Sequence, residues 1–160
     1  MLSTRTAPVR LLVAALLSLG LAAGLFAMTA TARTAPRASA TVTALTGDHA
    51  LAWARSRKGS PYAYGATGPH RFDCSGLTRW VYARLGKSLP HSSSRQAHDV
   101  VRISRSHARR GDLVFFYGYG GVYHVGIWAG HGYIWHAPFP GTHVRRQHLW
   151  TSHVFFGRVR

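Results

Sequence analysis

Apolar residues recur at helical spacing in two segments between residues 49 and 85. A first helix is expected over 49–58, because the Gly-Ser-Pro sequence that begins at Gly59 stops the pattern. A second helix follows a loop rich in glycine and aromatic residues, and it places Cys74 in its first turn. A short third helix is expected over 93–100. The inward-facing residues of the first two helices are Leu51, Ala54, Leu77, Trp80, Val81 and Leu85.

Beyond residue 111 the apolar residues fall into short runs that are typical of strands. In the clearest run, Val125 and Ile127 alternate with polar or small residues, and a Gly-His-Gly turn follows at 130–132. Helices followed by a meander of strands indicate an α+β fold with an antiparallel sheet. The expected strands are 112–117, 123–129, 133–137 and 154–159.

The first forty residues show a different pattern. Arg5 and Arg10 precede an uncharged apolar run at 11–28, and two A-x-A sites follow at 30–32 and 38–40. This order is typical of a cleaved secretory signal, although a single membrane anchor has an apolar run of similar length. Both interpretations place the folded domain outside the cytoplasmic membrane. We therefore divide the chain into a signal peptide with the start of a tether, a linker and one domain, at 1–40, 41–47 and 48–160.

The chain is strongly basic, with 20 lysine and arginine residues against four acids and a net charge of +16. Residues 41–160 keep all four acids and 16 of the basic residues, so the expected domain and linker carry +12. Such a domain is attracted to polyanions in a salt-dependent way. Outside the cell these are wall polymers, anionic lipid and acidic peptides. We expect no nucleic-acid partner, because no RNP-like or helix-turn-helix pattern occurs.

Cys74 is the only cysteine, which excludes an internal disulfide. A lone cysteine is commonly a buried and inert side chain. Cys74, however, is expected at a helix N-terminus, where unpaired N–H groups and the positive end of the helix lower the pKa of a thiol. The same N–H groups suit a developing oxyanion. The position therefore predicts a nucleophile.

Two histidines are placed to act as the base and as the residue that orients it. His124 begins one predicted strand and His136 ends the next, on either side of the tight turn. If the hairpin is symmetric about that turn, both imidazoles lie on one face of adjacent strands, because alternate residues share a face. His136 then orients His124 as the third member of a catalytic triad does. The other histidines lack the close pairs of zinc sites, so we expect neither a metal nor a cofactor.

Four ordered segments resemble the NlpC/P60 family of peptidoglycan hydrolases, and the resemblance covers roughly residues 48–160. The segment Pro61-Tyr62-Ala63-Tyr64-Gly65 is also similar to the aromatic sequence at the start of that domain. The family often has a Gly-Gly pair where this chain has Gly65-Ala66, in a loop that lines the substrate groove. The four segments are Phe72-Asp73-Cys74-Ser75-Gly76-Leu77-Thr78, Gly111-Asp112-Leu113-Val114-Phe115-Phe116, His124-Val125-Gly126-Ile127 and Ile134-Trp135-His136-Ala137-Pro138.

The resemblance implies a papain-like core, in which N-terminal helices, including the one that carries the cysteine, pack on the antiparallel sheet. It also implies a catalytic triad of a cysteine, a histidine and a third polar residue, with a substrate site beside it. Asp73 is implied to take the free L-Ala amine of the stem peptide. The implied triad is Cys74, His124 and His136, and the residues implied to form the oxyanion pocket and to hold substrate are Tyr62, Asp73 and Ser75.

We therefore expect a secreted, wall-associated cysteine endopeptidase that hydrolyses the stem peptides of peptidoglycan and acts as a monomer. The resemblance implies cleavage between D-γ-glutamate and the diamino acid. An amidase or a transpeptidase with the same triad is an alternative, and so is a non-catalytic basic protein that binds the wall. In each case the +12 charge predicts contact with anionic wall polymers.

Overall fold

A computed structural model describes the backbone of residues 35–160 and the side chains from Thr46 onward. The apolar run of the expected signal peptide and its first A-x-A site lie outside the described residues. Within them, none of the helices combines the length and the apolar character that crossing a membrane requires.

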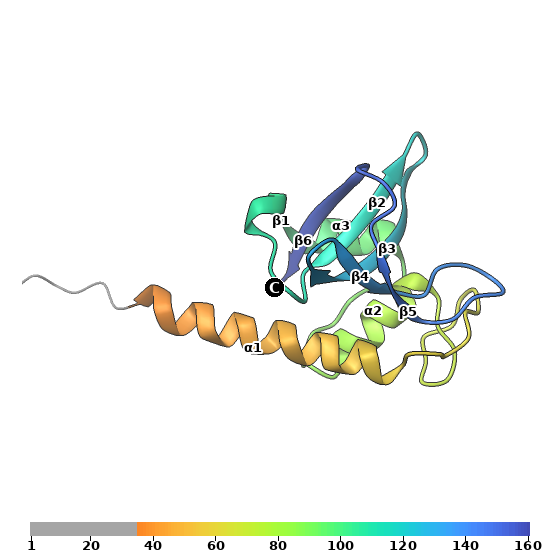
Figure 1. Ribbon diagram of the computed structural model, residues 1–160, viewed down its shortest axis with the longest axis horizontal. Helices are drawn as coiled ribbons and strands as arrows, with labels where there is room; N and C mark the ends of the chain where they lie inside the picture. The colour runs from red at the N-terminus through yellow and green to blue at the C-terminus, as the bar shows by residue number, and fades with distance from the viewer. Residues whose placement is uncertain (1–34) are drawn as a thin grey trace, which may run out of the picture. The chain divides into compact units, whose positions relative to one another are not determined.

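One antiparallel sheet of six strands carries the helices on one of its faces (Figure 1). This arrangement confirms the α+β class. The helices are α1 (Ala35–Ser56), α2 (Cys74–Ala83) and α3 (Ser93–Asp99), with a 3-10 turn, η1, at Arg105–His107. The strands, in the spatial order β1-β6-β2-β3-β4-β5, are β1 (Val100–Ile103), β6 (Val154–Val159), β2 (Leu113–Gly118), β3 (Gly121–Gly130), β4 (Tyr133–His136) and β5 (Arg145–His148).

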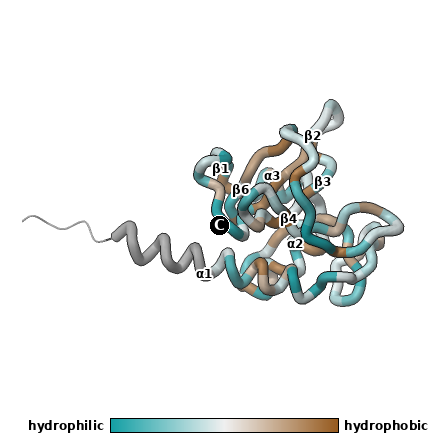
Figure 2. The backbone as a smooth tube through the Cα atoms, viewed as in Figure 1, coloured by the Kyte–Doolittle hydropathy of each residue, from teal (hydrophilic) through white to brown (hydrophobic). Residues whose placement is uncertain are grey.

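The two faces of the sheet carry separate apolar cores. On the helical face, Leu51 of α1 and Leu77 of α2 pack with the alternate strand residues Phe115 and Val125. The intervening strand residues point the other way, where the segments before β2 and between β5 and β6 cover them. In Figure 2 strands β2 and β6 are mostly brown, the colour of apolar residues. The second core consists of Val114, Phe116, Trp128, Ile134 and Phe156.

Helix α1 begins at Ala35, well before the predicted start after Gly47. Residues 41–47, which we expected to form a linker, therefore lie in the helix. Pro36 occupies the first turn, where a missing N–H costs nothing, and the segment that follows is rich in alanine, the strongest helix former. Local propensity thus extends the helix into a stretch that has no apolar periodicity.

The predicted strands are all present, and two further strands were not predicted. Strand β5 carries two arginines, a glutamine and a histidine, so it has no apolar alternation to recognise. It is an edge strand, where polar residues are usual. Strand β1 is the opposite edge, and its first residue, Val100, had been assigned to the end of the third helix.

Candidate active site

Cys74 is the first residue of α2, and the preceding Asp73 caps the helix. The Oδ1 atom of Asp73 accepts the N–H of Gly76 at 2.6 Å, which satisfies one of the N–H groups that a helix start leaves unpaired. Gly76 is required here because a Cβ at this position would lie 2.0 Å from the carbonyl oxygen of Ala66. The loop that precedes α2 is therefore held directly against the turn that presents the sulfur.

A buried glutamine on α3 fixes that first turn from the other side. The Nε2 group of Gln96 donates to the carbonyl of Ser75 at 2.9 Å and to the carbonyl of Pro90 at 2.8 Å. The Oε1 atom of Gln96 accepts the hydroxyl of Thr78 at 2.7 Å. Both ends of a fully buried amide are thus occupied, so the start of α2 has little freedom to move.

The sulfur of Cys74 lies against the beginning of β3. The backbone N–H groups of Val125, Ser75 and Cys74 itself all favour its thiolate. Burial and the neighbouring Asp73 carboxylate act more strongly in the opposite direction, and the pKa of the Cys74 thiol is raised. The lowered pKa predicted from the helix N-terminus is therefore wrong in sign, because burial of the sulfur and the Asp73 carboxylate outweigh the effect of the helix end. The group at rest is a thiol that requires a base.

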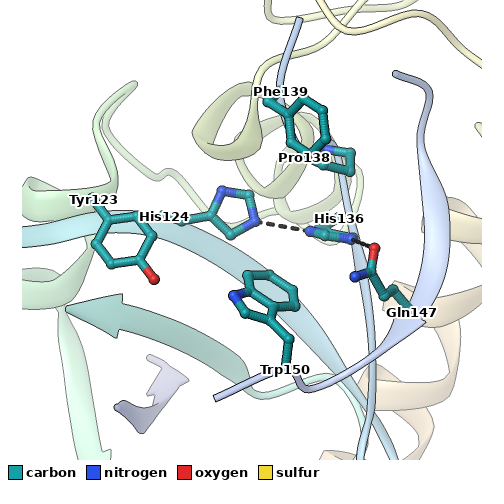
Figure 3. Close-up of a pocket in the computed structure, with 7 residues that line it drawn as sticks. All are labelled: Tyr123, His124, His136, Pro138, Phe139, Gln147 and Trp150. Atoms are coloured by element: carbon teal, nitrogen blue, oxygen red, sulfur yellow. Dashed lines mark hydrogen bonds between the residues drawn. The ribbon is translucent and has the colours of Figure 1, made fainter. Parts of the chain in front are cut away.

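His124 and His136 form a hydrogen bond between Nε2 of the first and Nδ1 of the second, at 2.9 Å (Figure 3). This confirms the predicted contact between the two rings. Their common face depends on a β-bulge, because the register runs Trp128↔Ile134 and then Gly130↔Tyr133. The extra residue between these pairs changes the parity, so even-numbered residues of β3 oppose even-numbered residues of β4. The hairpin thus has a two-residue turn plus a bulge in place of the expected symmetric three-residue turn. Both arrangements put His124 and His136 on one face of the sheet.

Gln147 on β5 extends this pair into a chain of three side chains (Figure 3). Its Oε1 atom lies 3.2 Å from Nε2 of His136 and also accepts the Nε–H of Arg145 at 2.9 Å. An arginine can only donate, so the amide atom that faces it must be the oxygen. The Nε2 atom of His136 therefore carries the proton, and its Nδ1 accepts from His124. This assignment leaves the lone pair of His124 at Nδ1, which is the tautomer that a base needs.

Aromatic side chains enclose the two imidazoles. The ring of Trp150 lies 5.4 Å from His136 and 5.9 Å from His124, and it stacks on Phe116 at 4.3 Å. Figure 3 shows the indole on one side of the rings and Phe139 on the other. The groove between these aromatic residues has a volume of about 440 Å³. It is mainly apolar, so it suits an apolar or ring-shaped part of a substrate.

Burial shifts both rings toward their neutral forms. Burial and the adjacent His136 lower the pKa of His124 to about 3. Burial also lowers the pKa of His136, to about 4, with Arg145 adding to the effect and the Gln147 acceptor opposing it. Neutral imidazoles at neutral pH are the state in which His124 can take a proton.

We expect this pair to make the fold sensitive to acid. In the unfolded chain the two rings take up protons below pH about 6.5, whereas in the folded protein they do not until about pH 4 and below. Stability is therefore lost as the pH falls through this window, by up to about 1.4 kcal/mol per pH unit for each ring. Urea unfolding between pH 7 and 4.5 measures the loss. His136→Asn should reduce the slope of the free energy of unfolding against pH by about one proton. His98→Asn, on the exposed side of α3, should leave that slope unchanged. Equal slopes in the two variants and the unaltered protein would contradict this account.

A second, polar hollow of about 400 Å³ lies on the cysteine side of the site. Tyr62, Asp73, Cys74 and Ser75, all predicted to belong to the site, line it together. Tyr62 lies near enough to Cys74 for the thiolate to raise the pKa of its phenol, although burial is the larger cause. Tyr123 lines both this hollow and the aromatic groove, so the two are adjacent parts of one site.

Asp73 already has four donors. Its Oδ1 atom accepts from the N–H of Gly76 and from the hydroxyl of Ser75 at 3.1 Å. Its Oδ2 atom accepts from the N–H of Gly65 at 2.9 Å and lies 2.8 Å from Nε2 of His91. Of these donors only His91 is a partly exposed side chain that lines the hollow. A substrate amine that reaches Asp73 must therefore displace or join His91.

Sequence reasoning missed four residues of the site: His91, Tyr123, Gln147 and Trp150. Gln147 lies on the unpredicted β5, and Trp150 follows it in a segment without periodicity. The sequence did contain one indication of Trp150. It is an isolated tryptophan in a polar stretch, and a large apolar side chain there needs a packing partner. Among the described residues, no group of three or more His, Cys, Asp or Glu side chains is placed to hold a metal ion.

Comparisons with known proteins identify the family. Residues 59–156 match the NlpC/P60 family. The chain belongs to that family. A protein named as a probable endopeptidase of Corynebacterium glutamicum is 48% identical over 103 residues, which is 64% of this chain and 48% of that protein. The bifunctional muramidase/DL-endopeptidase CwlT of Bacillus subtilis is 39% identical over 113 residues, which is 64% of this chain and 33% of that protein.

A solved structure of the same family has a similar fold. The NlpC/p60 domain of the peptidoglycan hydrolase SagA superposes with a TM-score of 0.64 and 38% identity, covering 69% of this chain and 96% of that chain. The chain spans about half the length of the Corynebacterium protein.

Proposed function

We propose that the protein is a cysteine endopeptidase that hydrolyses the stem peptides of peptidoglycan. The observation that carries the proposal is a thiol at a helix start beside the strand that carries an oriented imidazole pair. Cys74 starts α2 with the N–H of Val125 directed at its sulfur, and His124, the residue before Val125 in the sequence, is bonded to His136. The family relatives named as endopeptidases support the substrate class.

In the proposed mechanism the thiol proton of Cys74 passes to Nδ1 of His124 as the sulfur attacks the peptide carbonyl. The S–C bond forms while the carbonyl electrons move to the oxygen, which the N–H of Cys74 and the hydroxyl of Tyr62 stabilise. Collapse of this intermediate breaks the C–N bond, and His124 returns the proton to the leaving amine. Water, activated by the same imidazole, then hydrolyses the thioester and restores the thiol.

The proposed bond is the one between D-γ-glutamate and the diamino acid. The name DL-endopeptidase, given to the Bacillus relative, supports this choice. The polar hollow around Asp73 suits the amine of the stem peptide, and the aromatic groove lies on the other side of Tyr123. The peptide then crosses Cys74 from one to the other. We further propose that residues 1–40 direct export and that the domain acts at the wall.

Product analysis tests the proposal directly. Peptidoglycan fragments of known stem chemistry are digested, and the products are identified by mass spectrometry. We expect a new amine on the diamino acid and a fragment that ends in D-glutamate. Release of the intact stem from the sugar would instead indicate an amidase, and exchange onto an added amine without net hydrolysis would indicate a transpeptidase. The absence of any product, with binding to walls retained, would leave the non-catalytic alternative.

Gln147 is a positioning residue in this mechanism, and Gln147→Leu tests its role. Without the acceptor at Nε2, His136 is free to adopt the other tautomer and to lose its bond to His124. We expect kcat to fall about tenfold with KM little changed, together with a change in the ¹⁵N chemical shifts that report the tautomer of both rings.

Gln147→Glu is the matched control, because its carboxylate retains an acceptor and raises the pKa of His136. It should keep most of the activity and move the acid limb of the pH profile upward. Equal losses in the two variants, with unchanged ¹⁵N shifts, would show that Gln147 only supports the fold.

A further inference from the structure

A further hollow, distinct from the active site, is lined by five basic residues. It has a volume of about 480 Å³ and lies between α1 and the edge of the sheet at β4 and β5. Leu51, Ala129 and Trp135 supply its apolar part. We call it the basic cleft, and its cations are Arg55, Lys58, Arg110, Arg145 and Arg146.

Acidic side chains do little to neutralise the basic cleft. Of the four acids in the chain, Asp73 is bonded to His91 and Asp112 to Arg158, and neither these two nor Asp99 lines the cleft. Asp48 contacts Arg110 at 2.8 Å, but this pair is exposed to solvent, where such pairs contribute little. The positive charges of Arg55, Lys58, Arg110 and Arg146 around one hollow, with one acidic contact, repel one another, and an anion in the hollow would relieve that repulsion.

One guanidinium group of the cleft is held in place before any ligand arrives. Arg146 lies over the ring of Tyr133 at 4.0 Å, whereas the guanidinium of Arg145 is bonded to Gln147 on the face of the imidazole pair. Planar, fixed guanidinium groups are the side chains best suited to bind phosphate in a bidentate manner. Strand β5, which carries both, is hydrophilic along its whole length in Figure 2.

The basic cleft and the imidazole pair lie on opposite faces of the sheet. Trp135 belongs to the helical core and lines the cleft, whereas the next residue, His136, points to the other face and lines the aromatic groove. A ligand in the cleft therefore leaves the groove open. This arrangement allows one molecule to hold a polymer and cut a peptide at the same time.

We propose that the basic cleft binds a phosphodiester polymer of the cell wall and so localises the enzyme on its substrate. The proposal rests on the proposed wall function for the choice of polymer, and on the cleft itself for the chemistry. A chain of repeating phosphates that leaves the cleft meets further positive charge, because the domain and linker carry +12. A single small anion in the cleft would not contact this positive charge outside it.

The test compares two triple variants of the full chain that lose equal charge. Arg55→Gln, Lys58→Gln and Arg146→Gln remove three exposed cations of the cleft. The matched control removes three exposed cations elsewhere, by Arg79→Gln, Arg95→Gln and Arg105→Gln. Binding to a purified polyglycerol phosphate polymer is measured at fixed and at rising salt, and thermal unfolding confirms that both variants fold.

We expect the cleft variant to lose at least about tenfold in affinity and the control less than about threefold. Equal losses in the two variants would overturn the proposal in favour of diffuse charge. Tighter binding of the unaltered protein to anionic phospholipid vesicles, to a polyglutamate peptide or to single-stranded DNA would overturn the choice of polymer.

Activity separates this proposal from the proposed function. Cleavage of a soluble muropeptide without polymer should be unchanged in the cleft variant, and Cys74→Ala should bind the polymer as the unaltered protein does. An enzyme without peptidase activity whose cleft still binds would refute the proposed function alone. If the enzyme is fully active but the cleft variant binds the polymer as well as the control variant does, this inference alone is refuted.

Discussion

Cys74→Ala is expected to reduce the release of new amino groups from peptidoglycan by at least about 1000-fold. In the proposed mechanism the sulfur is the atom that forms the covalent intermediate. Its removal leaves the N–H groups of the first turn of α2 and the imidazole pair without a nucleophile to act on. Timed digestion of purified walls, with amine labelling of the products, measures the loss.

The substitution should leave the fold intact, because Cys74 is only partly buried and alanine suits a helix start as well. An unchanged melting temperature and unchanged wall binding therefore form part of the expected result. Ser106→Ala, on the exposed η1 turn, serves as the control substitution and should keep full activity. Substantial turnover by the Cys74→Ala protein would rule out the cysteine mechanism altogether.

His136→Ala should have the second largest effect, a fall in kcat of about 100-fold or more. The ring of His136 is almost completely buried and accepts the Nε2 proton of His124. Without it, His124 is free to rotate and to place its proton on Nδ1, the atom that should receive one from the thiol. His136 lines the aromatic groove but is almost completely buried, so KM should change less than kcat. Steady-state kinetics on a defined muropeptide separates the two quantities.

His136→Asn is the informative companion, because its amide oxygen can still accept from His124. We expect it to recover a measurable part of the activity that the alanine variant lacks. If the alanine and asparagine variants lose activity equally and KM rises in both, the ring only fills space. If the alanine variant retains most of its kcat, His124 is oriented by other contacts.

The sequence was sufficient for the parts of the fold that are built from apolar alternation. Strands β2, β3 and β6 and helix α2 were predicted because their inward residues are apolar and regularly spaced. Strand β5 was not, because an edge strand that faces solvent needs no apolar residue. Gln147 lies on this strand and was therefore not predicted. The acceptor that fixes the tautomer of the two imidazoles was missed for the same reason.

The electrostatics of the cysteine could not be read from the sequence either. The helix N-terminus and the neighbouring histidine were visible, and both lower the pKa of a thiol. The depth of burial and the orientation of the Asp73 carboxylate were not visible, and these outweigh the other effects. The sign of such a shift depends on distances, which residue types and spacing do not provide.

The bulge between Trp128 and Gly130 has a consequence for how relatives of this protein are recognised. An insertion or deletion of a single residue in that hairpin keeps every conspicuous motif and separates the two histidines by the thickness of the sheet. Motif matches alone would count such a chain as an enzyme. The length of the segment that joins the two strands is therefore a better guide to an intact catalytic pair than the presence of both histidines.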